Sequence, residues 1–264
     1  ADAAKGRKPM TTPIGESDLA LALECERRIV NAWPAVSTLV MGDWVIRFAN
    51  GYSGRANAAT PLKAGAELDE ATLDLIAELY RSDGLPPCIR LTPLTGEATR
   101  EAVLARGYRL KDASFGLIAP LEPLTPDFHP ALLMETGPSA EWIAGVAARQ
   151  SGNKTNAEHL AAIVRKVRLP AVFATFLLDG QPVAYGMSVA ERGMAEIGLI
   201  VVDDAHRGRG LGRRLVEGLM SWARVQGCGQ AYLQVDQTNA VAIALYGSLG
   251  FRRLYAYETR ILDL

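Results

Sequence analysis

The stretch Asp203–Gly212 reads DDAHRGRGLG, and it is the most informative part of the chain. A β-like run precedes it and an amphipathic, helix-like run follows it. It contains the pattern Arg207-x-x-Gly210-x-Gly212, in which glycine lets the backbone approach a ligand closely. The first amides of a helix have no helical partner, and the helix dipole adds partial positive charge there. The turn is therefore suited to holding a pyrophosphate.

Other interpretations of this turn fit less well. A plain surface loop does not explain the four arginines around it, which are Arg207, Arg209, Arg213 and Arg214. A Rossmann dinucleotide site needs G-x-G-x-x-G in an early βαβ unit, whereas this spacing is G-x-G-x-G and comes late. A P-loop ends in Gly-Lys-Ser/Thr, and that tripeptide does not follow. NAD binding is therefore the weakest of the alternatives that we keep.

A second motif lies downstream, where residues 239–251 read NAVAIALYGSLGF. The turn and this segment together resemble the GNAT superfamily of acyl-CoA-dependent N-acyltransferases. That family has an R/Q-x-x-G-x-G/A loop at the start of a helix and an N-x-x-A-x-x-x-Y-x-x-x-G-F segment after it. The resemblance covers the chain from Ser139 to its end. It implies an α/β fold and acetyl-CoA as cosubstrate.

The resemblance also implies where acetyl-CoA would bind. The strand 194–202 would splay from the strand 231–235, and the pantetheine arm would lie between them. Backbone groups near Ile200 and Val202 would bind this arm, and one of them would polarise the thioester carbonyl. The backbone N–H groups of Gly208, Gly210, Gly212 and Arg213 would hold the pyrophosphate. Arg207 and Arg209 would lie near it, and Asn239 would touch the pantetheine.

Two residues are candidates for proton transfer. Tyr246 matches the tyrosine that the family commonly uses as general acid for the departing thiolate. Glu196 stands on the cofactor strand where several protein-acetylating members carry a base. Each has an alternative, because Tyr246 could be a core aromatic residue and Glu196 a solvated strand carboxylate, with water relaying the proton.

The composition is that of an ordinary globular protein. There are 28 Lys and Arg against 29 Asp and Glu, so no global charge favours nucleic acid or a membrane surface. Three widely spaced cysteines, Cys25, Cys88 and Cys228, indicate buried thiols in a cytoplasmic protein. The three histidines lack metal-ligand spacing, and we expect no metal. No apolar run reaches the length of a membrane span.

The order of expected elements indicates two GNAT-like halves, each a mixed central β-sheet flanked by helices. We expect a mobile tail over 1–15, a degenerate GNAT-like domain over 16–118, a proline-rich linker over 119–138 and a catalytic GNAT domain over 139–264. We expect a first helix that is capped by Ser17 and ends before Pro34. Further helices are expected over 69–81, 97–106, 140–150, 157–167, 211–225 and 240–249. Strands are expected over 38–41, 44–48, 88–91, 114–118, 171–178, 182–190, 194–202, 231–235 and 254–262.

The degenerate half is inferred from an internal repeat. A shift of 143 residues places Gly107-Tyr108 on Gly250-Phe251, with strand, turn and helix ahead of each in register. The same shift puts Glu67 on Gly210 and Asp69 on Gly212, and acidic side chains there would repel coenzyme A. The arrangement resembles tandem acetyltransferases such as mycothiol synthase.

The sequence leaves the acceptor open. The polar segment 50–57, NGYSGRAN, could line the acceptor cleft, but a surface loop is the favoured interpretation. We expect an N-acetyltransferase that transfers an acetyl group from acetyl-CoA directly to a primary amine, with a homodimer possible. The alternative is a non-catalytic acyl-CoA-binding regulatory protein, which would have no need of the Tyr246 phenol.

Overall fold

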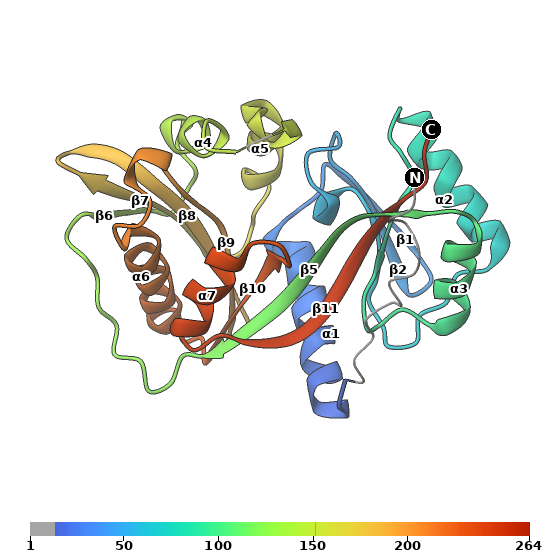
Figure 1. The fold of residues 1–264 in the computed structure, drawn as a ribbon, viewed down its shortest axis with the longest axis horizontal. Helices are drawn as coiled ribbons and strands as arrows, with labels where there is room; N and C mark the ends of the chain where they lie inside the picture. Colours follow the sequence, from blue (N-terminus) through green and yellow to red (C-terminus); the bar gives the residue numbers. More distant parts are fainter. Residues whose placement is uncertain (1–13, 151) are drawn as a thin grey trace, which may run out of the picture.

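One continuous mixed sheet runs through the whole molecule (Figure 1). The computed structural model describes residues 14–150 and 152–264, so nearly all of the expected tail lies outside the described residues. Within these residues the sheet has eleven strands in the order β1-β2-β3-β4-β11-β5-β10-β9-β8-β7-β6. Helices pack on both faces, as the α/β class predicts.

The first half of the chain supplies the right-hand part of Figure 1. Its elements are α1 (Glu16–Ala32), β1 (Ser37–Met41), β2 (Trp44–Phe48), η1 (Gly54–Ala56), β3 (Ala59–Pro61), α2 (Glu70–Ser82), β4 (Cys88–Leu91), α3 (Glu97–Ala105) and β5 (Arg109–Pro120). The expectation that Ser17 caps the first helix is wrong. The N-cap is Gly15, and Ser17 lies in the first turn, between the acidic residues Glu16 and Asp18 that suit the helix dipole.

The second half supplies the remaining elements. These are β6 (Leu132–Glu135), α4 (Ala140–Ala147), η2 (Gly152–Thr155), α5 (Ala157–Val164), β7 (Ala171–Leu178), β8 (Gln181–Glu191), β9 (Met194–Val202), η3 (Asp204–His206), α6 (Leu211–Val225), β10 (Gln230–Asp236), α7 (Ala240–Ser248) and β11 (Arg252–Ile261). The segment expected to be a linker holds the end of β5 and the whole of β6. The division into domains stays a prediction.

The two halves exchange their last strands. β5 pairs with β10 of the second half, while β11 lies between β4 and β5 (Figure 1). Adding 143 to the bounds of α3 gives those of α7, and the same shift brings β5 onto β11. Each half thus completes its sheet with the strand that is equivalent to its own. This exchange makes the sheet continuous and places the N-terminal segment 50–57 opposite the C-terminal half.

Three large apolar cores and one small apolar cluster hold the sheet and helices together. The amphipathic α6 buries Leu215, Leu219 and Ala223 completely and packs against β7, β8 and β9, as its sequence periodicity predicts. On the opposite face, α1, α4 and α5 pack over the same sheet, and α2 and α3 cover the first half. The predicted burial of Cys25, Cys88 and Cys228 is confirmed, and all three are free thiols.

In the part of the chain that the structure describes, no helix is both long and apolar enough to cross a membrane.

Candidate active site

The glycine-rich turn forms the start of α6. Gly210 is the N-cap with a φ of 77°, and Gly208 has a φ of 74°, a left-handed region that favours glycine. The first α-helical bond after this cap runs from the Arg214 amide to the Gly210 carbonyl, at 3.1 Å. The amides before Arg214 therefore precede the helical ladder, as an anion site of the predicted kind requires.

The space around the turn is open. A Cβ added at Gly208 or Gly210 would meet no atom within 4 Å, so the backbone is accessible from that side. Gly212 is packed more closely, because a Cβ there would lie 3.5 Å from Leu245 and 3.7 Å from Val202. The turn is thus anchored by Gly212 and exposed at Gly208 and Gly210.

The arginines of the turn are only partly free to bind phosphate. Arg207 pairs with Asp204 at 2.7 Å, and Arg213 pairs with Glu217 at 3.0 Å and donates to the Ser248 hydroxyl. Arg209 is exposed. Asn239 caps α7, where its Oδ1 accepts a hydrogen bond from the Ala242 amide at 3.0 Å. Capping of α7 therefore explains why an asparagine stands here. The cap uses only the side-chain oxygen, so the amide nitrogen could donate to a ligand.

β9 and β10 separate in the way that the resemblance implies. Their parallel register covers three pairs and ends at Tyr232 and Glu196. Beyond that pair β10 continues beside β5, while β9 continues beside β8. A bulge in β9 has one extra residue opposite β8, and Leu199 within it has a φ of 54°. Because a bulge bends its strand, it accounts for the divergence.

The opening exposes the edge of β9 that carries the remaining predicted backbone ligands. Ile200 and Val202 lie in the separated part of the strand and are partly exposed. Their edge is able to bind an extended chain as a further strand would. The structure thus brings the turn, Ile200 and Val202 to one side of the second half.

Glu196 lies at the point where the two strands separate. Its side chain is 3% exposed, and burial raises the pKa of its carboxyl from 4.5 to about 7, with nearby Arg55 acting in the opposite direction. A Cβ at Gly198 would lie 2.8 Å from Glu196 Oε1, so glycine makes room for the carboxylate. The alternative of a solvated strand carboxylate is therefore wrong, and the role of Glu196 as a base stays a prediction.

The Glu196 carboxylate lies close enough to Tyr246 to affect the pKa of its hydroxyl. Burial first, and the Glu196 carboxylate second, raise the pKa of the Tyr246 hydroxyl to about 12. The ring is 7% exposed and packs edge-on against Phe251, with centroids 5.8 Å apart. The phenol therefore stays protonated over the whole physiological range. It is also part of the core, as the structural interpretation of Tyr246 expects, and its role as general acid stays a prediction.

Arg55 is the residue that sequence reasoning missed. Its Nη1 lies 3.6 Å from Glu196 Oε1, and its guanidinium lies over the Trp33 ring at 5.4 Å. The segment 50–57 is not a surface loop, because Tyr52, Ser53 and Asn57 are buried. The polar sequence around Arg55 was the available signal, but only the exchange of strands between halves brings it to Glu196.

The segment that carries Arg55 is held by its own buried polar groups. Asn57 Oδ1 accepts from the amides of Ala49 at 2.6 Å and Gly51 at 2.9 Å, and its Nδ2 donates to the Ser53 carbonyl at 2.8 Å. The buried Arg47 donates to the Arg55 carbonyl at 2.6 Å. These bonds fix the backbone from which Arg55 extends.

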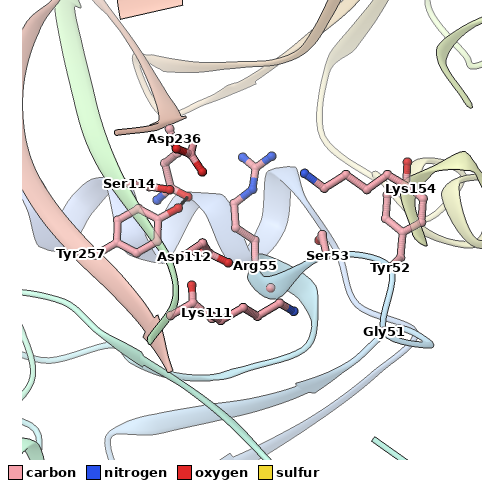
Figure 2. Close-up of a pocket in the computed structure, with 13 residues that line it drawn as sticks. Gly51, Tyr52, Ser53, Arg55, Lys111, Asp112, Ser114, Lys154, Asp236 and Tyr257 are labelled. Carbon is pink, nitrogen blue, oxygen red and sulfur yellow. Dashed lines mark hydrogen bonds between the residues drawn. The ribbon is translucent and has the colours of Figure 1, made fainter. Parts of the chain in front are cut away.

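A cavity of about 400 Å³ lies beside Arg55, between the halves (Figure 2). One wall is the segment Gly51–Arg55 and another is Lys154 of η2. Strand residues form the rest, and they include Asp112, Ser114, Gln234, Asp236 and Tyr257. In the described residues, no group of three or more His, Cys, Asp or Glu could hold a metal ion.

These features can be compared with known proteins. The family model described as "Probable histone acetyltransferase Rv0428c C-terminal" matches residues 23–259, which is most of the chain. The chain belongs to this family of GNAT acetyltransferases.

Relatives and solved structures agree with this assignment of the acetyltransferase. This chain is 26% identical over 241 residues to a Bacillus subtilis protein named "Uncharacterized N-acetyltransferase YobR". The match covers 89% of this chain and 96% of that protein. A GCN5-related N-acetyltransferase from Kribbella flavida has a similar fold, with a TM-score of 0.63 and 18% identity over 94% of this chain and 95% of that one.

A tandem GNAT protein from the clavulanic acid biosynthesis pathway is also similar, with a TM-score of 0.59 and 16% identity. The match covers 96% of this chain and 89% of that one. The resemblance stated from the sequence is therefore confirmed, and so is the α/β fold of the GNAT type. The chain is an N-acetyltransferase rather than a non-catalytic binding protein.

Proposed function

We propose that the chain uses acetyl-CoA bound in the second half and acetylates a primary amine with Glu196 as general base and Tyr246 as general acid. The observation that carries this proposal is the position of Glu196. It is buried where β9 and β10 part, and its pKa is raised to about 7. A base works best when its pKa lies near the pH at which it operates.

The open turn and the strand opening fit the cosubstrate. The pyrophosphate would be held by the amides of the turn, including those of Gly208, Gly210 and Gly212. Arg207, Arg209 and Arg213 would add positive charge around it. Ile200 and Val202 would bind the pantetheine through their backbone, and Asn239 through its side-chain amide. Bound acetyl-CoA supplies an acetyl group that is already activated as a thioester.

The first half offers no equivalent anion site at its corresponding helix. At the start of α2, the Asp69 carboxylate accepts from the Thr72 amide at 2.7 Å. At the start of α3, the Glu67 carboxylate accepts from the Thr99 amide at 2.7 Å and from the Thr99 hydroxyl at 2.6 Å. Carboxylates of the chain itself thus occupy these helix ends, which supports a single cosubstrate site in the second half.

The residues of the site divide the proton transfers between them. Glu196 accepts a proton from the acceptor ammonium, and the neutral nitrogen then forms its bond to the carbonyl carbon. As the carbon–sulfur bond breaks, Tyr246 donates its hydroxyl proton to the sulfur, and the remaining extra proton of the acylated nitrogen passes to the phenolate, which restores Tyr246. Glu196 then releases its proton to solvent. A backbone amide in the separated part of β9 would polarise the carbonyl, a role that typically contributes several kcal/mol.

The test is thiol release from acetyl-CoA with a panel of primary amines. We expect amine-dependent, saturable release in the wild type and a loss of about 10²-fold or more in kcat for Glu196→Gln. Release that does not depend on an amine would show hydrolysis instead. Unchanged turnover in Glu196→Gln would assign deprotonation to water.

A further inference from the structure

The cavity between the halves has the size of a small-molecule site. Its volume of about 400 Å³ lies within the usual range for such sites, roughly 300–1,000 Å³. It adjoins Arg55, whose guanidinium lies 3.6 Å from Glu196. Glu196 is the register partner of Tyr232, and Gln234 of the cavity floor is two residues further along β10, a distance of about 7 Å. The cavity thus begins close enough to Glu196 for one small molecule to reach both.

Three cations from separate segments face this cavity. They are Arg55 from η1, Lys111 from β5 and Lys154 from η2. In Figure 2 the Lys154 ammonium points toward the Arg55 guanidinium, and Lys111 extends beneath Arg55. Within the described ranges 14–150 and 152–264, Arg55 has an ion pair within 4.0 Å, to Glu196, whereas Lys111 and Lys154 have none.

A strand irregularity turns Lys111 toward the cavity. Neighbouring residues of a regular strand point to opposite faces, yet Lys111 and Asp112 both line this cavity. In the pairing of β5 with β11, Thr259 is opposite Asp112 and Arg260 is opposite Leu110, so Lys111 is an extra, bulged residue. Bulges commonly re-aim a side chain beside a functional site. The irregularity in β5 therefore directs the Lys111 side chain toward the cavity.

The cavity also carries negative groups, on its strand floor. Asp112 and Asp236 line it, and one carboxylate oxygen of Asp236 is engaged by the Thr238 amide at 2.7 Å and the Thr238 hydroxyl at 2.6 Å. Ser114 and Tyr257 add hydroxyl groups. A ligand that matches this lining carries an ammonium group and an oxyanion on one small body.

We propose that the cavity binds the acceptor, and that the acceptor is a small amine bearing an oxyanion, carboxylate or phosphate, a few bonds from the reacting nitrogen. Arg55, Lys111 and Lys154 hold the oxyanion, while the amine faces Glu196. This inference rests on the acetyl transfer proposed above. Lys154 is exposed, yet the protein around its ammonium removes some of its hydration, and this desolvation together with nearby Arg55 lowers its pKa. An anion bound between the two cations relieves this repulsion.

The test compares amines that carry an oxyanion with amines that lack it. The full chain is assayed for thiol release with free amino acids and their carboxamides, with phosphoethanolamine and ethanolamine, and with a lysine-containing peptide. The same compounds are tested for binding by thermal shift. The variants are Lys111→Gln and Lys154→Gln, with Lys63→Gln as the matched control, because Lys63 pairs with Asp43 at the surface, outside the cavity.

We expect kcat/KM for the anionic amines to exceed that for their neutral partners by about tenfold or more, the effect of one charge-assisted hydrogen bond. Lys111→Gln and Lys154→Gln should each reduce this preference, Lys63→Gln should not, and acetyl-CoA affinity should be unchanged in all three. The amino acid and phosphoethanolamine arms distinguish a carboxylate from a phosphate.

Equal use of neutral amines or of the lysine peptide would overturn the inference, and so would a preference that survives both lysine variants. If acetyl-CoA binds but no amine turns over, absence of thermal stabilisation by every anionic amine overturns it equally. Failure to bind acetyl-CoA would instead refute the proposed function, and the thermal shifts with anionic amines would still decide the charge preference of the cavity.

Discussion

Replacing Arg55 by methionine tests whether the first half of the chain tunes the base of the second. Methionine keeps the length of the apolar stem but removes the charge 3.6 Å from the Glu196 carboxylate. Without this cation the pKa of Glu196 should rise above its value of about 7, because the charged form loses its favourable partner. The free base should then be available only at higher pH.

The size of the shift follows from the distance. Two unit charges 3.6 Å apart attract by about 1 kcal/mol at the dielectric constant of water and by about 4–5 kcal/mol at an effective value of about 20. Arg55 is partly exposed, so the lower end applies, and about 1.4 kcal/mol corresponds to one pKa unit. The pKa of Glu196 should therefore rise to about 8. At pH 7 its ionised fraction should fall about fivefold.

The assay is the pH dependence of kcat/KM for thiol release, measured with one acceptor so that the ionisation of the amine is common to all variants. The acidic limb should move up by about one pH unit in Arg55→Met and stay in place in Arg55→Lys, which keeps the charge. Arg55 also faces the acceptor cavity, so the height of the profile should fall as well. An acidic limb that stays in place in Arg55→Met would refute the coupling of Arg55 to Glu196.

Three further substitutions probe other parts of the account. Tyr246→Phe should lower kcat by about 10²-fold with unchanged acetyl-CoA affinity in calorimetry, and an equal loss of affinity would assign the hydroxyl to binding. In the wild type the pKa of Glu196 is about 7 in the folded chain, against 4.5 for an ordinary glutamate in the unfolded chain. Its stabilising effect is therefore present below pH 4.5 and is lost as the pH rises to 7, by up to about 3 kcal/mol. Urea unfolding of Glu196→Gln should lack this loss, and parallel curves of stability against pH for the two proteins would contradict the argument. Arg90→Met leaves Glu26, its buried partner at 2.6 Å, unpaired, and should lower the free energy of unfolding by about 3–5 kcal/mol; a loss below about 1 kcal/mol would argue against a role for this pair in joining α1 to β4.

Local patterns predicted the second half well, because its elements are governed by short-range periodicity. The bounds of β9 and α6 agree with the sequence expectation at both ends. Turn chemistry at Gly208 and Gly210 and the helix cap at Asn239 are local as well, so the candidate cosubstrate residues could be chosen from the sequence. The roles of these residues toward acetyl-CoA stay predictions.

Long-range pairing was not predictable in the same way. The exchange of β5 and β11 depends on register between segments more than 130 residues apart, and no local pattern encodes it. The approach of Arg55 to Glu196 follows from that exchange. β6 was missed because the proline-rich sequence around Leu132–Glu135 masks a short edge strand, whose pairing with β7 supplies its stability.

Calorimetric titration with acetyl-CoA tests the central claim most directly, with the wild type beside Gly210→Glu and Gly180→Glu. The two glycines have φ values of 77° and 76° and open space around them, so both substitutions impose similar backbone strain, but only Gly210 belongs to the turn before α6. We predict one site per chain in the wild type, retained in Gly180→Glu and lost in Gly210→Glu. No binding by the wild type, or equal binding by Gly210→Glu, would contradict the assignment of the acetyl-CoA site.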